Sequence, residues 1–153
     1  MHRAVLRAIA TAFPGRTTGD HLDVGSGTGE LLQLFRTHYS FRLFGCDYTD
    51  KLTQVAGLQI DIVDLNRQPL PYADNRFALM TCIETIEHLE NYRQVIREIY
   101  RVLQPGGVAI FSAPNIPNLR SRLRYLSSGF YDLFGLLCPT KQRCIPRAAI
   151  SIR

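Results

Sequence analysis

The chain has 153 residues, of which 46% are hydrophobic and 20% charged, a composition that suits one soluble domain with a buried core. Its four cysteines form no C-x-x-C pair, no apolar run reaches membrane-spanning length, and the N-terminus lacks the apolar stretch of a signal peptide. These features argue against structural zinc and a transmembrane segment, so we expect a reduced, cytoplasmic protein with a formal net charge of +5.

Helical and strand-like patterns alternate along the first 118 residues. Apolar residues at helical spacing predict helices over 2–13, 30–37 and 92–103, with a weaker helix over 50–57. Short apolar runs predict strands over 21–24, 41–46, 59–63, 77–83 and 108–112, the last of them entered through a turn at 105–107. This alternation predicts an α/β fold with a doubly wound, mostly parallel sheet, and the apolar strands fit burial on both faces.

The segment Leu-Asp-Val-Gly-Ser-Gly-Thr-Gly-Glu at 22–30 is the most informative part of the chain. Gly25, Gly27 and Gly29 alternate between a predicted strand and a helix, where glycine lets the backbone approach a ligand closely. The N-terminus of that helix offers unpaired N–H groups to an anion or nucleotide. Glu30 stands where a dinucleotide fingerprint has its third glycine, which argues against a nicotinamide oxidoreductase. A glycine turn of some other α/β protein is the open alternative.

Acidic residues follow the next strands. Asp47, Asp64 and Glu84 each stand at the end of a predicted strand. Because ligands of open parallel sheets bind beyond the carboxyl ends of the strands, these acids and the glycine turn predict one nucleotide-like site.

Asp23 and the G-x-G-x-G spacing after it resemble motif I of the class I S-adenosylmethionine-dependent methyltransferases. Three further segments, Leu70–Phe77, Leu103–Gly107 and Ser112–Asn118, resemble the same family, so the likeness covers about residues 20–118. It is greatest to the ubiquinone-biosynthesis O-methyltransferases and the methionine-biosynthesis W-type proteins. The resemblance implies a Rossmann-like methyltransferase fold and S-adenosylmethionine as cofactor.

The resemblance also assigns roles to the strand-end residues. It implies that Asp47 accepts hydrogen bonds from the ribose hydroxyls, that Tyr48 packs against adenine or ribose, and that Asp64 and the Leu65 N–H hold adenine. An N-cap role for Asp47 and a loop-capping role for Asp64 are the alternatives. The full predicted cofactor set is Asp23, Gly25, Ser26, Gly27, Gly29, Asp47, Tyr48, Asp64 and Leu65.

The segment Cys82–Leu89 resembles the Glu-x-x-Glu-His motif that follows strand four in ubiquinone-biosynthesis and small-RNA methyltransferases. In some relatives Glu84, Glu87 and His88 would correspond to ligands of a divalent metal, and they would share one face of a helical turn. Without metal, His88 is the candidate general base for an acceptor hydroxyl or amine. The alternative is that these residues build the turn, and whether they bind metal stays open.

The predicted activity is methyl transfer to oxygen of a small-molecule or lipid-linked acceptor. The alternative is a catalytically inactive or truncated cofactor-binding module. Nucleic acid is not expected as a substrate, because the RNA enzymes have a later histidine and this chain has none after His88. The sequence predicts no oligomeric state.

Residues 1–118 are predicted to form the cofactor-binding core, and 119–153 a basic C-terminal helix with an irregular tail. The family adds an antiparallel strand hairpin here, but 138–153 are too few for two strands, so the hairpin is missing or incomplete. The strand at 108–112 then needs a partner or the tail to cover its edge. From residue 116 on there are seven basic residues and one acidic residue. Segment 119–137 is interpreted as a lid and interfacial helix at a membrane surface, a site for phosphorylated substrates, or an ordinary surface helix.

Overall fold

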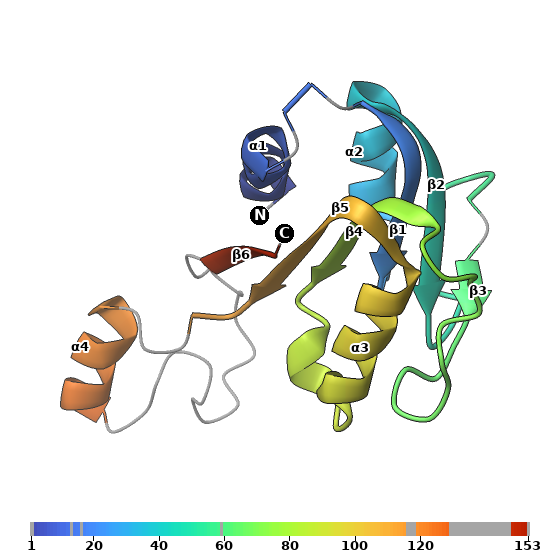
Figure 1. Ribbon diagram of the computed structural model, residues 1–153. Coiled ribbons are helices and arrows are strands. Elements are labelled where there is room, and N and C mark those ends of the chain that lie inside the picture. Colours follow the sequence, from blue (N-terminus) through green and yellow to red (C-terminus); the bar gives the residue numbers. More distant parts are fainter. Residues whose placement is uncertain are drawn as a thin grey trace.

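The computed structural model describes residues 2–12, 14–15, 17–58, 60–115, 119–128 and 148–152. One six-stranded sheet organises them, in the order β3-β2-β1-β4-β5-β6 (Figure 1). β3, β2, β1, β4 and β5 are parallel, and β6 is antiparallel to β5. The strands are β1 (Thr18–Val24), β2 (Ser40–Asp47), β3 (Ile60–Ile62), β4 (Phe77–Ile83), β5 (Leu103–Ala113) and β6 (Ala148–Ile152). The helices are α1 (His2–Ala12), α2 (Glu30–His38), the 3₁₀ turn η1 (Ile86–His88), α3 (Tyr92–Val102) and α4 (Leu119–Ser128).

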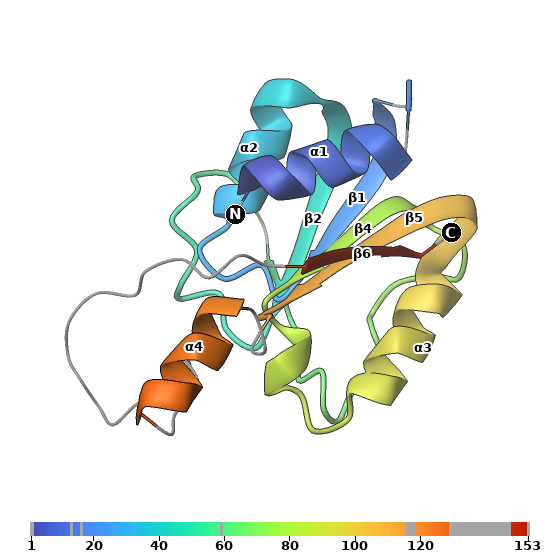
Figure 2. The same ribbon diagram turned by 90° about the vertical axis from the view of Figure 1, so that its left-hand side faces the viewer.

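Helices cover both faces of the sheet, as Figure 2 shows. On one face α1 and α2 bury Val5, Ile9, Leu31 and Phe35 against the strands. On the other face α3 buries Val95, Ile99 and Val102, which recur at the spacing of one helix face. Two apolar clusters, one on each face, account for strands without polar alternation. The predicted doubly wound, mostly parallel α/β fold is confirmed.

The predicted helix over 50–57 is wrong, because this segment forms consecutive turns. The N–H groups of Thr53 and Leu58 donate three residues back, and the Thr49 hydroxyl accepts from the Lys51 N–H, an alternative to helical pairing. Val55 and Leu58 instead lie against the glycine turn, within 3.2 Å of where a Cβ on Gly29 would stand.

The predicted turn at 105–107 lies inside β5 as an irregularity. Pairing between β4 and β5 shifts from Phe77 opposite Leu103 to Leu79 opposite Val108. Gly106 has a φ of 74°, a conformation that lets the backbone form this irregularity within the strand.

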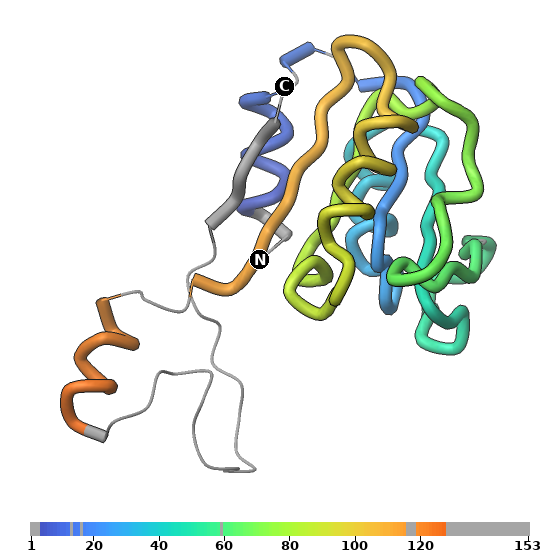
Figure 3. Tube along the Cα trace, turned by 60° about the horizontal axis from the view of Figure 1, so that its bottom comes forward, coloured from blue at the N-terminus to red at the C-terminus, as the bar shows by residue number. Residues whose placement is uncertain are grey.

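The edge of β5 is covered by β6, which pairs antiparallel along Ala109–Ala113. The predicted missing or incomplete hairpin also concerns residues 129–147, which lie outside the described residues, so this part of the prediction stays a prediction. The predicted helix in 119–137 is present as α4 up to Ser128, and the rest of that segment lies outside the described residues. The predicted boundary at 118 also falls outside them. α4 lies apart from both layers of the core (Figure 3). No helix in the described ranges is both long and apolar enough to cross a bilayer.

Candidate functional site

The carboxyl ends of β1, β2 and β4 meet where the strand order reverses. From β1 the chain moves outward to β2 and β3, then returns to place β4 on the other side of β1. In open α/β sheets a crevice forms at such a switch point, because the connections leave in opposite directions. The turn after β1 lies in this position.

The three glycines of that turn all have positive φ, 74° at Gly25, 52° at Gly27 and 78° at Gly29. L-residues with a side chain rarely adopt this conformation. A Cβ on Gly25 would also overlap the Thr85 side chain, whereas a Cβ on Gly27 would meet no atom within 4 Å. Gly25 is therefore required by packing inside the protein, and Gly27 borders open space where a ligand can approach the backbone.

Asp47, at the end of β2, fixes this turn. One of its carboxylate oxygens accepts from the Gly27 N–H and the other from the Tyr48 N–H, each at 2.7 Å. The Cys46 carbonyl adds bonds from the Gly25 and Ser26 N–H groups. Because each carboxylate oxygen has two lone pairs, Asp47 keeps acceptor capacity for a ribose hydroxyl.

Two other motif I residues face the protein. The Ser26 hydroxyl is buried beside Gly45 and has no hydrogen-bond partner in the described residues. Gly29 is the N-cap of α2, and its carbonyl accepts from the Gln33 N–H. The buried Ser26 side chain and the Gly29 backbone thus shape the turn, and the predicted contact of both residues with a cofactor stays a prediction.

The predicted adenine side of the site lies at the ends of β2 and β3. Tyr48 is 74% exposed, and Ile62, opposite Asp47 in the register, is 62% exposed. The Asp64 carboxylate caps its own loop by accepting from the Asn66 N–H, so the alternative role is present in the structure. The Leu65 side chain is buried, and within the described part of the chain no group accepts from its N–H.

Asp23 belongs to a buried hydrogen-bond chain. The Thr81 hydroxyl donates to Asp23 Oδ1 at 2.6 Å and lies 2.9 Å from His21 Nε2, which therefore is the donor in that contact. The His21 ring stacks on Phe35 with centroids 4.0 Å apart. Burial raises the pKa of Asp23 to about 7, despite the Thr81 hydrogen bond, and lowers the pKa of His21 to about 3. The sequence had indicated no role for His21 or Thr81.

Glu84, Glu87 and His88 follow β4 but do not gather. Glu84 has a φ of 54°, unusual for a residue with a side chain, and accepts from the Ser112 hydroxyl at 3.0 Å. Glu87 and His88 lie in the single 3₁₀ turn η1 and are exposed. The expected shared helical face does not form, and the described residues contain no group of three side chains able to hold a metal ion. His88 lies after β4, at the edge of the sheet that carries the glycine turn, and its role as general base stays a prediction.

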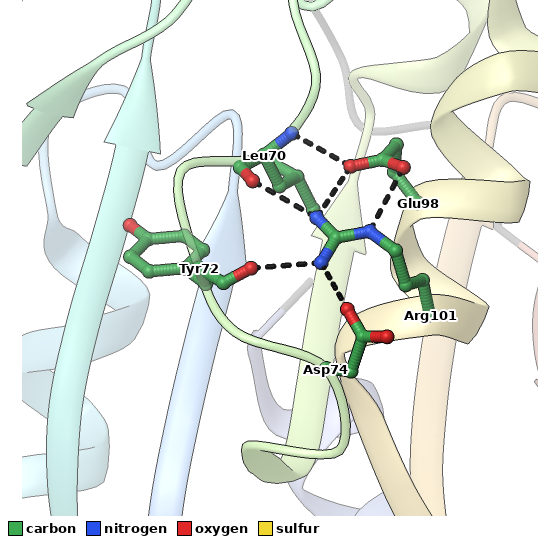
Figure 4. Close-up of polar contacts among 5 residues, drawn as sticks. All are labelled: Leu70, Tyr72, Asp74, Glu98 and Arg101. Carbon is green, nitrogen blue, oxygen red and sulfur yellow. Dashed lines mark hydrogen bonds and ion pairs between the residues drawn. The ribbon is translucent and has the colours of Figure 1, made fainter.

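A cluster that the sequence did not indicate holds the loop before β4 (Figure 4). Arg101 of α3 donates to the carbonyls of Leu70 and Tyr72, and it forms ion pairs with Glu98 and Asp74 at 2.6 Å. Glu98 in turn accepts from the Leu70 N–H at 2.9 Å. Arg101 lowers the pKa of Glu98, so the pair stays charged. The i, i+3 spacing of Glu98 and Arg101 on a helix was the available signal.

Comparison with known proteins identifies relatives of this fold. Residues 22–111 match the family described as Methyltransferase domain. A ubiquinone/menaquinone biosynthesis C-methyltransferase of Desulfotalea psychrophila is 30% identical over 111 residues, which are 66% of this chain and 44% of the relative. A demethylmenaquinone methyltransferase of Listeria welshimeri is 34% identical over 130 residues, 74% of this chain and 55% of the relative.

A solved S-adenosylmethionine-dependent methyltransferase from Mesorhizobium loti superposes with a TM-score of 0.60 and 22% identity, over 72% of this chain and 54% of that one. At this identity the likeness is one of fold. The chain spans about half the length of the curated relatives that it matches.

Proposed function

The chain belongs to the methyltransferase-domain family, and from this premise we propose that it binds S-adenosylmethionine and transfers its methyl group to an acceptor that carries a hydroxyl on an aromatic ring. The observation that carries the proposal is the glycine turn at the switch point, held by Asp47 with Gly27 beside open space. S-adenosylmethionine supplies an electrophilic methyl group on its sulfonium sulfur.

The residues present fit this cofactor. Asp47 has lone pairs left for ribose hydroxyls, and the Leu65 N–H is a donor to a ring nitrogen. Tyr48 and Ile62 offer exposed apolar surface at the ends of β2 and β3. Asp23 lies buried behind the turn, where it accepts a hydrogen bond from Thr81, so its contribution to cofactor binding would be indirect.

A hydroxylated aromatic acceptor reconciles two lines of support. Sequence reasoning favours methylation of oxygen, while the relatives' names specify carbon of a quinone precursor. When a base removes the hydroxyl proton of a phenol, the negative charge is delocalised over the oxygen and the ring carbons ortho and para to it. His88, exposed at the site edge, is the proposed base and would take the hydroxyl proton in either case. The methyl group leaves the sulfonium, which becomes the thioether of S-adenosylhomocysteine. After methylation at carbon, the hydrogen of that ring carbon also leaves as a proton, and the hydroxyl is re-formed. Alignment of acceptor and methyl group then selects the atom.

Calorimetric titration with S-adenosylhomocysteine tests the cofactor site. We expect binding to the wild-type chain and roughly 10- to 100-fold weaker binding to Asp47→Asn, because two charge-assisted hydrogen bonds to ribose are weakened. Asp50→Asn, an exposed acid on the next loop, is the matched control and should bind like wild type. A folded chain that binds no S-adenosylhomocysteine would contradict the proposal.

Product analysis tests the acceptor. With a panel of catechols and hydroquinones as acceptors, the rate of transfer of a labelled methyl group should be lower for His88→Gln than for the wild-type chain. The affinity for the cofactor should be unchanged. Nuclear magnetic resonance of the product then distinguishes methylated oxygen from methylated carbon. Cofactor binding without transfer to any acceptor would favour a cofactor-binding module instead.

A further inference from the structure

α4 presents its apolar side outward. Leu119, Leu123 and Leu126 recur at i, i+4 and i+7, which places them on one face of the helix, and they are 73%, 59% and 81% exposed. Ser121, on the opposite face, is fully buried. This is the reverse of α3, whose Val95, Ile99 and Val102 face the sheet, and it leaves the stripe formed by the three leucines of α4 in contact with water.

Arginines flank this stripe. Arg120 follows Leu119, and Arg122 precedes Leu123, so at about 100° per residue they stand on opposite sides of the leucines. α4 contains no acidic residue, and Arg124 adds a third positive charge. Long arginine side chains can reach outward past the apolar stripe while their guanidinium groups stay in a polar layer.

We propose that α4 lies in the surface of an anionic lipid bilayer, with Leu119, Leu123 and Leu126 at the acyl boundary and Arg120 and Arg122 on the lipid phosphates. A bilayer surface offers apolar and anionic partners in this layered order. Nucleic acid would supply phosphates but no partner for three leucines, and an apolar protein groove would not require arginines on both sides.

The place of α4 in the fold gives this contact a direction. α4 follows β5, whose Ser112 bonds Glu84 at the edge that carries the glycine turn. Figure 1 and Figure 2 show α4 projecting from that edge, away from both layers of the core. A membrane bound by α4 would therefore lie on the side of the proposed site, where an acceptor held in lipid could enter.

Vesicle flotation tests the proposal without cofactor or acceptor, so it is independent of the proposed function. The full chain should float with phosphatidylcholine vesicles that contain phosphatidylglycerol and much less with phosphatidylcholine alone. Arg120→Gln with Arg122→Gln should weaken partitioning by roughly 20- to 30-fold. Leu123→Gln with Leu126→Gln should weaken it at least about tenfold, because the apolar area is lost.

Matched variants on α3 control for charge and for exposed apolar surface. Arg93→Gln with Arg97→Gln removes two exposed arginines from the surface of α3. Tyr100→Gln removes a side chain of the same helix that is 82% exposed. Both should float like wild type, and circular dichroism should show that every variant is folded.

Three outcomes would overturn the proposal. The first is a folded wild-type chain that floats with neither vesicle. The second is binding that depends on the arginines alone and is matched by RNA or heparin. The third is self-association in solution that disappears in the leucine variant, which would identify the stripe as a protein interface.

Discussion

Gly25 is the residue at which the glycine turn packs against the segment that follows β4. Its φ of 74° disfavours any side chain, and a Cβ would overlap Thr85 as well. We expect Gly25→Ala to destabilise the chain by about 2–4 kcal/mol and Gly27→Ala by only about 1 kcal/mol, because Gly27 has open space beside it. Urea unfolding measures both.

Adding Thr85→Gly to Gly25→Ala separates the two causes. The overlap is then removed and only the backbone strain remains, so the double variant should recover about half of the loss. Equal stabilities of the two alanine variants would show that Thr85 does not constrain the turn.

The buried pair His21 and Asp23 predicts opposing pH effects. For Asp23, whose pKa rises from 3.8 to about 7 on folding, the native chain holds more protons between those values, so its contribution to stability falls as pH rises. For His21, whose pKa falls from 6.5 to about 3, the native chain holds fewer protons in that window, and its contribution rises with pH. Between about pH 4 and 6.5 the two largely cancel.

Asp23→Asn removes one side of this balance. Relative to wild type, the variant should gain about 1.4 kcal/mol of unfolding free energy per pH unit from about pH 4 to 7, and nothing further above that range. Denaturant unfolding at several pH values gives this difference directly. A difference that does not change with pH would mean that Asp23 titrates alike in the folded and unfolded chain.

At the scale of elements, Arg101 joins α3 to the loop that leads into β4. Its planar guanidinium donates hydrogen bonds to two carbonyls and two carboxylates at once, which the single ammonium group of a lysine cannot do. Since Arg101 is about one-third exposed, solvent screens part of this energy. We expect Arg101→Met to cost about 1–2 kcal/mol and Arg101→Lys nearly as much.

Arg97→Met is the control, because Arg97 is exposed on the same helix. It should unfold within about 0.5 kcal/mol of wild type. If Arg101→Lys were as stable as wild type, positive charge alone would account for the contact and the fork geometry would be unimportant.

Whether an element could be predicted from the sequence depends on how far apart in the chain the residues that stabilise it lie. The glycine turn and the strand-end acids Asp47 and Asp64 are set by residues within a few positions, and the structure brings them to one edge. The helix predicted at 50–57 failed because Val55 and Leu58 pack against Gly29, more than twenty positions earlier. The contacts of Thr85 and Arg101 likewise join segments that are distant in the sequence, and the spacing of apolar residues does not predict such contacts.

At the scale of the whole molecule, the sheet has to end without exposing β5. β6 covers that edge along Ala109–Ala113, and α1 contacts both strands (Figure 1). The sequence predicted that this edge needs a partner or the C-terminal tail, but it did not specify which residues would pair there, because any strand-length segment satisfies an open edge.

Removing the pairing of β6 should therefore cause association. Ile150→Pro with Ser151→Pro eliminates two consecutive N–H groups, one of which faces β5 in an antiparallel ladder, opposite Phe111 or Ile110. We expect larger species than wild type in size-exclusion chromatography with light scattering, increasing with concentration, because the apolar edge of β5 is then free to pair with another chain. Ile150→Thr with Ser151→Thr keeps both N–H groups and should behave like wild type. If the proline variant has the mass of wild type at every concentration, β6 is not what protects this edge, and another segment of the chain must cover it.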